Sequence, residues 1–78
     1  MSAIILFINN GKSYDLEVPL DISANDLVTA VNKYFNLGIN LKDSRECYLK
    51  SEEPLALLKG DKTLEEYGIR TGSLVKHE

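Results

Sequence analysis

The chain has 78 residues, of which 44% are hydrophobic and 27% are charged, and its formal net charge is −3. This length predicts one domain, residues 1–78, whose core is too small to enclose a deep substrate cavity. The acidic balance argues against a nucleic-acid partner, because binding to phosphates needs clustered lysine and arginine.

The longest apolar run, residues 3–8, is far shorter than the roughly 20 residues that cross a bilayer. We therefore expect no direct membrane insertion and a location in the cytoplasm.

The first predicted elements are two strands joined by a tight turn. Residues 3–9 and 13–20 flank Asn10-Gly11, a pair that tolerates positive φ and is typical of a β-hairpin. Apolar and acidic side chains alternate along the second strand, in the order Tyr14, Asp15, Leu16, Glu17 and Val18. This alternation predicts a strand that is covered on one side only.

A helix is predicted after the hairpin. Ser23 is placed to cap its first turn, and Asp26 stands three residues later, as in a capping box. Apolar side chains then recur at helical spacing, at Leu27, Val31, Tyr34 and Phe35. We expect Gly38 to end the helix in a left-handed conformation.

The second half of the chain predicts shorter elements. Residues 46–51 and 54–58 have the pattern of two short strands, 61–68 that of a helical turn capped by Thr63, and 73–77 that of a last strand. The order β-β-α-β-β-turn-β predicts an α+β fold, in which a mixed five-stranded sheet packs on one main helix. This arrangement is the β-grasp.

No pattern in the sequence points to catalysis, a cofactor or a metal. The adjacent carboxylates of residues 52–53 and 65–66 do not converge, since neighbours in a strand face opposite sides and neighbours in a helix diverge by ~100°. Cys47 is the single cysteine, and we expect it to lie in a strand as a small apolar side chain. We therefore expect no catalytic residue, no cofactor-binding residue, no metal ligand and no enzyme activity.

Two segments carry a family resemblance. NGKSYDLEV resembles the first hairpin of ubiquitin-like proteins, and GDKTLEEYGIRTGSLV resembles their last turn and strand. A free-standing acidic domain of this length is most similar to the YukD-like family, the small cytoplasmic ubiquitin-like component associated with type VII (WXG100) secretion in Gram-positive bacteria. The resemblance implies an accessory or regulatory role without catalysis, at the periphery of a membrane complex. Its implied partner is a protein, such as a membrane component or an ATPase of the secretion machine.

Attachment of a ubiquitin-like protein to a target needs a C-terminal pair of glycines. The five glycines here are all isolated, so we expect no conjugation. Two alternative functions stay open. The first is a regulatory adaptor unrelated to secretion, and the second is a covalent protein modifier. The oligomeric state is open between a monomer and a weak dimer.

A protein-binding patch is predicted from the expected register of the first hairpin. If Tyr14, Leu16 and Val18 face the helix together with the even-numbered residues of the first strand, Ile5 and Phe7 face outward. The last strand is expected beside the first, with Leu74 outward. Because exposed apolar clusters tend to mark interaction sites, we predict that Ile5, Phe7 and Leu74 form a binding patch on the open face of the sheet.

Overall fold

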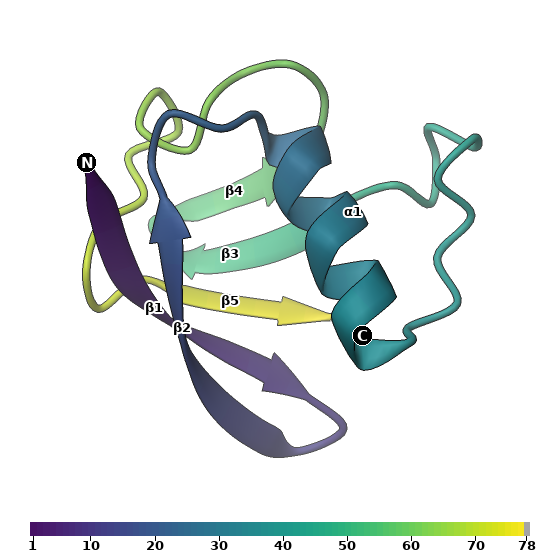
Figure 1. The fold of residues 1–78 in the computed structure, drawn as a ribbon, viewed down its shortest axis with the longest axis horizontal. Helices are drawn as coiled ribbons and strands as arrows, with labels where there is room; N and C mark the ends of the chain where they lie inside the picture. Colours follow the sequence, from purple (N-terminus) through teal and green to yellow (C-terminus); the bar gives the residue numbers. More distant parts are fainter. Residues whose placement is uncertain (78) are drawn as a thin grey trace.

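The computed structural model describes residues 1–77, and residue 78 lies outside the described part. The elements are β1 (Ser2–Asn9), β2 (Lys12–Pro19), α1 (Ala24–Phe35), β3 (Leu49–Glu53), β4 (Leu55–Leu58) and β5 (Leu74–His77). The strands form one sheet in the order β2-β1-β5-β3-β4. β1 and β5 are parallel, and the other neighbouring strands are antiparallel. The predicted fold, a mixed five-stranded sheet with α1 packed against one face, is confirmed (Figure 1).

The first hairpin turns at Asn10-Gly11, as predicted. Both residues have positive φ, 53° and 73°, which a two-residue type I′ turn requires. Asn9 therefore lies opposite Lys12, and the register continues with Phe7 opposite Tyr14.

This register corrects the predicted orientation of β1. Residues that lie directly opposite in an antiparallel pair share a face of the sheet. Ile5 lies opposite Leu16, so the odd-numbered residues of β1 face α1 together with the apolar residues of β2. The prediction had placed the even-numbered residues there, and it was wrong by one residue in register.

The core lies between the covered face of the sheet and α1. The sheet contributes Ala3, Ile5, Phe7, Val18, Leu49, Leu58 and Val75, and the helix contributes Ala24, Leu27, Val28 and Val31. Three aromatic rings meet at one end of this core: Phe35 lies 5.0 Å from Phe7 and 4.8 Å from Tyr14, between ring centroids. Such tilted contacts add to the stabilisation from burial.

The two ends of α1 are capped differently. Ser23 accepts a hydrogen bond on Oγ from the backbone N–H of Asp26 at 3.1 Å, which is the predicted N-cap. The helix ends at Phe35, three residues before the predicted stop at Gly38. Asn36 adopts the left-handed conformation with a φ of 55°, and its N–H donates to the carbonyl of Asn32.

The turn at residues 63–68 closes the covered face at the opposite end. Its capping box is complete: Glu66 N–H donates to Thr63 Oγ1 at 3.1 Å, and Thr63 N–H donates to Glu66 Oε1 at 2.9 Å. The N–H of Leu64 donates to the carbonyl of Ile22 at 3.0 Å, and the Leu64 side chain is fully buried. The predicted cap at Thr63 therefore anchors a core side chain.

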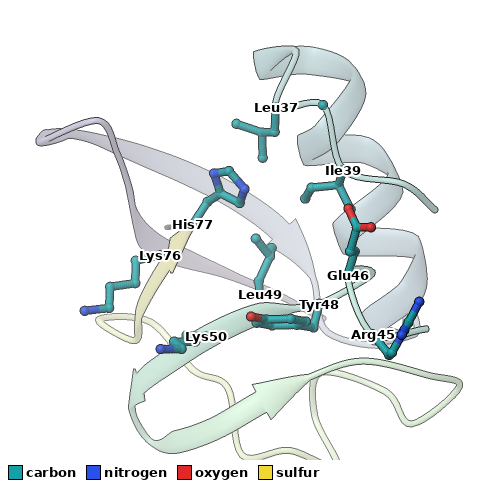
Figure 2. Close-up of a pocket in the computed structure, with 10 residues that line it drawn as sticks. Leu37, Ile39, Arg45, Glu46, Tyr48, Leu49, Lys50, Lys76 and His77 are labelled. Carbon is teal, nitrogen blue, oxygen red and sulfur yellow. The ribbon is translucent and has the colours of Figure 1, made fainter. Parts of the chain in front are cut away.

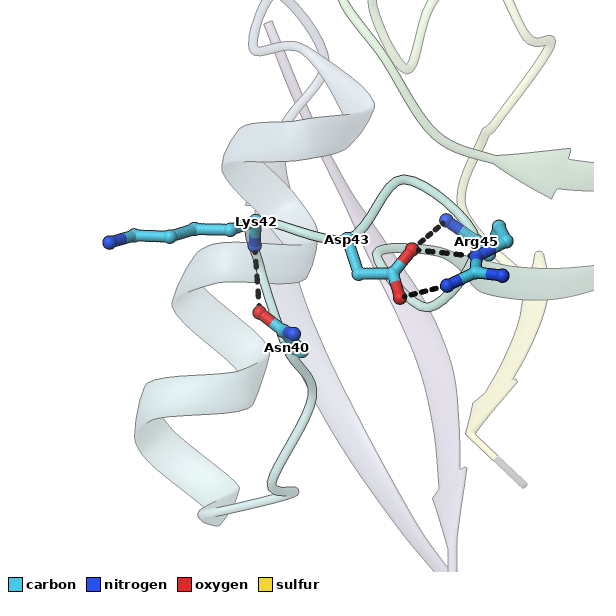
Figure 3. Close-up of polar contacts among 4 residues, drawn as sticks. All are labelled: Asn40, Lys42, Asp43 and Arg45. Atoms are coloured by element: carbon cyan, nitrogen blue, oxygen red, sulfur yellow. Dashed lines mark hydrogen bonds and ion pairs between the residues drawn. The ribbon is translucent and has the colours of Figure 1, made fainter.

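The loop between α1 and β3 is longer than predicted, because β3 begins at Leu49 and not at residue 46. The backbone N–H groups of Glu46 and Cys47 both donate to the carbonyl of Asp43, so this stretch forms a turn. The Asp43 carboxylate also accepts from the backbone and side chain of Arg45 (Figure 3). These local side-chain bonds compete with strand pairing.

Candidate protein-binding surface

The face of the sheet that α1 leaves uncovered, called the open face below, has an apolar centre. Since side chains alternate along a strand, the even-numbered residues of β1 point to this face. Ile4 is 50% exposed, and Leu6 and Ile8 are half-buried. Leu74 of β5 lies opposite Leu6 and is also half-buried. These four residues, Ile4, Leu6, Ile8 and Leu74, form the open-face patch.

The predicted patch of Ile5, Phe7 and Leu74 is corrected by this arrangement. Ile5 is 1% exposed and Phe7 is 0% exposed, so neither side chain can reach a partner without unfolding the core. Leu74 keeps its predicted outward orientation, while Val75 is buried. The two-residue turn at Asn10-Gly11 contained the information for the correct prediction. It sets the register between β1 and β2, and therefore which residues of the two strands share a face.

Acidic side chains border the open-face patch along β2. Asp15 lies opposite Leu6, and Glu17 lies opposite Ile4. Glu17 also accepts a hydrogen bond from Ser2 Oγ at 3.0 Å.

Basic side chains border the patch on its other side. Lys76 lies opposite Ile8, and Lys50 of β3 lies opposite Lys76. Lys76 forms an ion pair with Glu52 at 2.9 Å. The open face therefore carries an apolar centre between an acidic and a basic margin.

Two exposed leucines lie on β4, the edge strand on the basic side, beyond Lys50 and Glu52 of β3. Leu55 is 88% exposed and Leu57 is 49% exposed. With Lys50, Glu52 and Lys76 they line a shallow hollow of about 330 Å³. Exposed apolar side chains with a polar border are a common feature of protein-binding sites.

A second hollow lies where β5 and β3 meet the loop after α1. His77, Leu37, Ile39, Tyr48 and Leu49 are among its lining residues (Figure 2). Its volume of about 190 Å³ lies below the ~300–1,000 Å³ typical of small-molecule sites.

Two carboxylates have a lowered pKa, and both stabilise turns. The side-chain and backbone bonds from Arg45 lower the pKa of Asp43, since they favour the charged carboxylate (Figure 3). The backbone and hydroxyl bonds from Thr63 lower the pKa of Glu66 in the same way. Both groups act in local structure, away from the open-face patch.

The described residues hold no cluster of three or more metal-ligating side chains. Within residues 1–77, α1 is too short to be a candidate for a membrane-spanning helix. Cys47 is buried, as its apolar character predicts, but it lies in the loop before β3 and not in a strand. Its Sγ donates a hydrogen bond to Asn25 Oδ1 at 3.4 Å.

Comparison with solved structures identifies the fold as ubiquitin-like. The chain is similar to the ubiquitin-like domain of Dsk2 from Plasmodium falciparum, with a TM-score of 0.66 and 18% identity over 100% of both chains. It is also similar to the ubiquitin-like domain of the type VII secretion system protein ECCD1 from Mycobacterium tuberculosis. That match has a TM-score of 0.61 and 16% identity, over 97% of this chain and 96% of the other. At these identities the likeness establishes the fold alone.

The family follows from the sequence. Residues 3–76 match the family described as "WXG100 protein secretion system (Wss), protein YukD". The chain therefore belongs to the YukD family of ubiquitin-like proteins, and the resemblance noted in its hairpin and last turn is confirmed. A comparison with curated proteins found no match.

Proposed function

We propose that this protein is a non-catalytic interaction component of a Gram-positive type VII secretion system, with an accessory or regulatory role, and that it acts without being attached to a target. The observation that carries the proposal is the open-face patch in a chain of the YukD family. Because function resides in particular sites and not in the fold itself, the proposal rests on the surface that this chain presents. The proposed location is the cytoplasm, at the periphery of the membrane complex.

The open-face patch is the proposed contact with the secretion machine. Apolar side chains at its centre supply the binding energy on burial, and the charged margins orient the partner. Leu6 and Leu74, which lie opposite each other at the centre, are the residues that we expect to lose most area to a partner. A membrane component or the ATPase of the machine is the proposed partner.

A crosslinking pull-down from the membrane and soluble fractions of the native cell tests this proposal. Wild type is compared with a Leu6→Glu, Leu74→Glu variant, which places charges on the patch and leaves the core residues unchanged. Leu41→Glu is the control for an added carboxylate at a surface leucine, because Leu41 is 39% exposed in the loop between α1 and β3. Circular dichroism and urea unfolding must show first that each variant folds.

We expect wild type and the control to enrich the same membrane secretion component, and the double variant to lose it. Equal retention by all three proteins would place the contact elsewhere on the molecule. If none of them enriches a secretion component, the proposed role in secretion is wrong, and a regulatory adaptor outside secretion becomes the better explanation.

The absence of conjugation is tested separately by mass spectrometry of the protein purified from its native cell. Within the 78 residues no two glycines are adjacent, whereas conjugation of a ubiquitin-like protein uses a glycine pair. We expect no isopeptide-linked species, and finding them would establish a covalent modifier instead.

A further inference from the structure

The outer edge of β2 is open for pairing. Within residues 1–77, β2 pairs with β1 alone and stands at the end of the strand order. The N–H of Leu20 donates to the carbonyl of Met1 at 2.9 Å. Because bonded pairs alternate in an antiparallel ladder, Val18, Leu16 and Tyr14 also direct their backbone groups to β1. The backbone groups of the residues between them point to the outer edge, and these residues are Ser13, Asp15 and Glu17.

An apolar groove runs along this edge, between β2 and α1. Its volume is about 360 Å³, and its walls are formed by Leu16 and Val18 of β2 and by Ala30 and Tyr34 of α1. Ala30 is exposed. Tyr34 is 81% exposed, although its ring makes an edge-on contact with the ring of Phe35, with 4.9 Å between the centroids. Open backbone groups and an apolar groove on the same side of a strand are what an added strand requires.

The charges on β2 determine which kind of strand fits. Side chains of an added strand would alternate between the groove and the open face, like those of β2 itself. Those on the open face would lie beside Asp15 and Glu17, which are both exposed. Opposite charges stabilise such a cross-strand pair, and like charges destabilise it.

We propose that the β2 edge and the β2–α1 groove bind an extended segment of a partner protein, in which aliphatic residues alternate with lysine or arginine. The aliphatic residues fill the groove against Leu16, Ala30 and Tyr34. The basic residues pair with Asp15 and Glu17, while the backbone adds a strand to the sheet. Pairing ends at Pro19, which has no N–H to donate. This site goes beyond the proposed function: it shares Asp15 and Glu17 with the margin of the open-face patch, but its backbone edge and groove lie outside that patch, and it requires no secretion component.

The same charges disfavour a second copy of the chain as the occupant. Antiparallel pairing of β2 with β2 of another copy would bring the carboxylates of Asp15 and Glu17 next to those of their counterparts. Acidic residues on an edge strand are a known means of preventing such self-association.

The test uses NMR of the 15N-labelled protein, titrated with three amidated and acetylated peptides. The probe is Val-Lys-Val-Lys-Val, the charge-reversed control is Val-Glu-Val-Glu-Val, and the composition control, which breaks the alternation, is Val-Val-Val-Lys-Lys. We expect only the first peptide to shift the amide signals of β2 and of Ala30 and Tyr34 together. It should also slow hydrogen exchange at the Asp15 and Glu17 amides, because these become donors in the new ladder.

Two variants sharpen the test. Asp15→Lys, Glu17→Lys should reverse the preference to the Val-Glu peptide and weaken binding of the Val-Lys peptide roughly two- to thirty-fold. Its matched control is Asp61→Lys, Glu65→Lys, which changes the net charge equally at exposed positions outside the groove and should leave the affinity unchanged. Ala30→Gln, which keeps the charge and suits a helix, should obstruct the groove and weaken binding.

Several results would overturn the proposal. One is the absence of any shift with the Val-Lys peptide up to concentrations on the order of 1 mM, where even weak peptide binding is detected. Another is equal binding of the three peptides. Shifts confined to the open face, or unprotected Asp15 and Glu17 amides in the bound state, would also contradict strand addition at β2.

Discussion

The two faces of the sheet are built from the same strands but have opposite surroundings. On the covered face, α1 and the turn at 63–68 bury Ile5 and Phe7 to 1% exposure or less. On the open face, their neighbours Ile4, Leu6 and Ile8 stay half-buried or exposed. Apolar character therefore does not separate core from surface in β1. This strand therefore stabilises the fold with its odd-numbered residues, and its even-numbered residues form the surface that we propose for binding.

The largest expected difference between the two faces follows from truncating one residue on each. Phe7→Ala should lower the free energy of unfolding by about 3–5 kcal/mol, because a cavity would remain beneath Phe35. The domain has a net stability of only about 5 kcal/mol, so this variant should be largely unfolded or close to it. Urea denaturation followed by circular dichroism measures the free energy of unfolding of wild type and of the variant.

Ile8→Ala on the open face is the matched change, and it should cost about 1 kcal/mol or less. Equal losses for the two variants would contradict the assignment of the faces.

The turn at 63–68 gives a second, smaller effect on the covered side. Thr63→Ala removes the hydroxyl that accepts from Glu66 N–H, and it should cost about 1 kcal/mol. Thr63→Ser keeps the hydroxyl and is the control. Thermal unfolding of both variants measures the difference, and a Thr63→Ser variant as unstable as Thr63→Ala would show that the methyl group matters more than the cap.

Acid should weaken the same turn. The bonds from Thr63 lower the pKa of Glu66 below its ordinary value of 4.5 in the folded state. As pH falls, the unfolded chain therefore binds this proton first. The stabilisation is complete above about pH 4.5 and is lost as pH falls through the folded pKa.

Glu66→Gln provides the comparison for this pH effect, because the amide oxygen can accept the same bonds without titrating. We expect wild type to be the more stable protein at pH 7 and this difference to shrink in acid. Urea unfolding of both proteins at several pH values is the measurement, and a difference independent of pH would rule out the contribution of Glu66.

The smallest expected effect is on the open face, at the ion pair between Lys76 and Glu52. The side chain of Glu52 is 45% exposed, so solvent screens the attraction. A double-mutant cycle with Glu52→Gln and Lys76→Gln should give a coupling energy of about 0.2–1 kcal/mol, decreasing with added salt. A larger coupling that is insensitive to salt would mean that this part of the open face is less accessible to water than the structure indicates.

Local patterns predicted most of the architecture correctly. Asn10-Gly11 indicated the hairpin, Ser23 the start of α1 and Thr63 the capped turn, because each depends on contacts within a few residues. The end of α1 and the start of β3 were misplaced. Asn36 adopts the left-handed conformation two residues before Gly38. The carbonyl of Asp43 accepts hydrogen bonds from Glu46 and Cys47, at the start of the predicted strand, and so holds these two residues in a turn.

The candidate surface could not be predicted as reliably, because β1 is apolar at odd and even positions alike. Its own pattern therefore contains no information on which face is buried. Leu74 was placed correctly, because the resemblance to the last strand of ubiquitin-like proteins puts Val75 in the core and Leu74 outward. The groove beside β2 was not anticipated, because it depends on how closely α1 approaches an edge strand.

The sequence alone determined the order of elements, the tight turns, the ubiquitin-like fold class and the YukD family, because these depend on local conformational preferences and on residues in fixed order. Only the tertiary structure decided how closely α1 approaches the β2 edge and how much of each side chain on the open face stays exposed. Both depend on packing between elements that are distant in the sequence, which no local pattern contains.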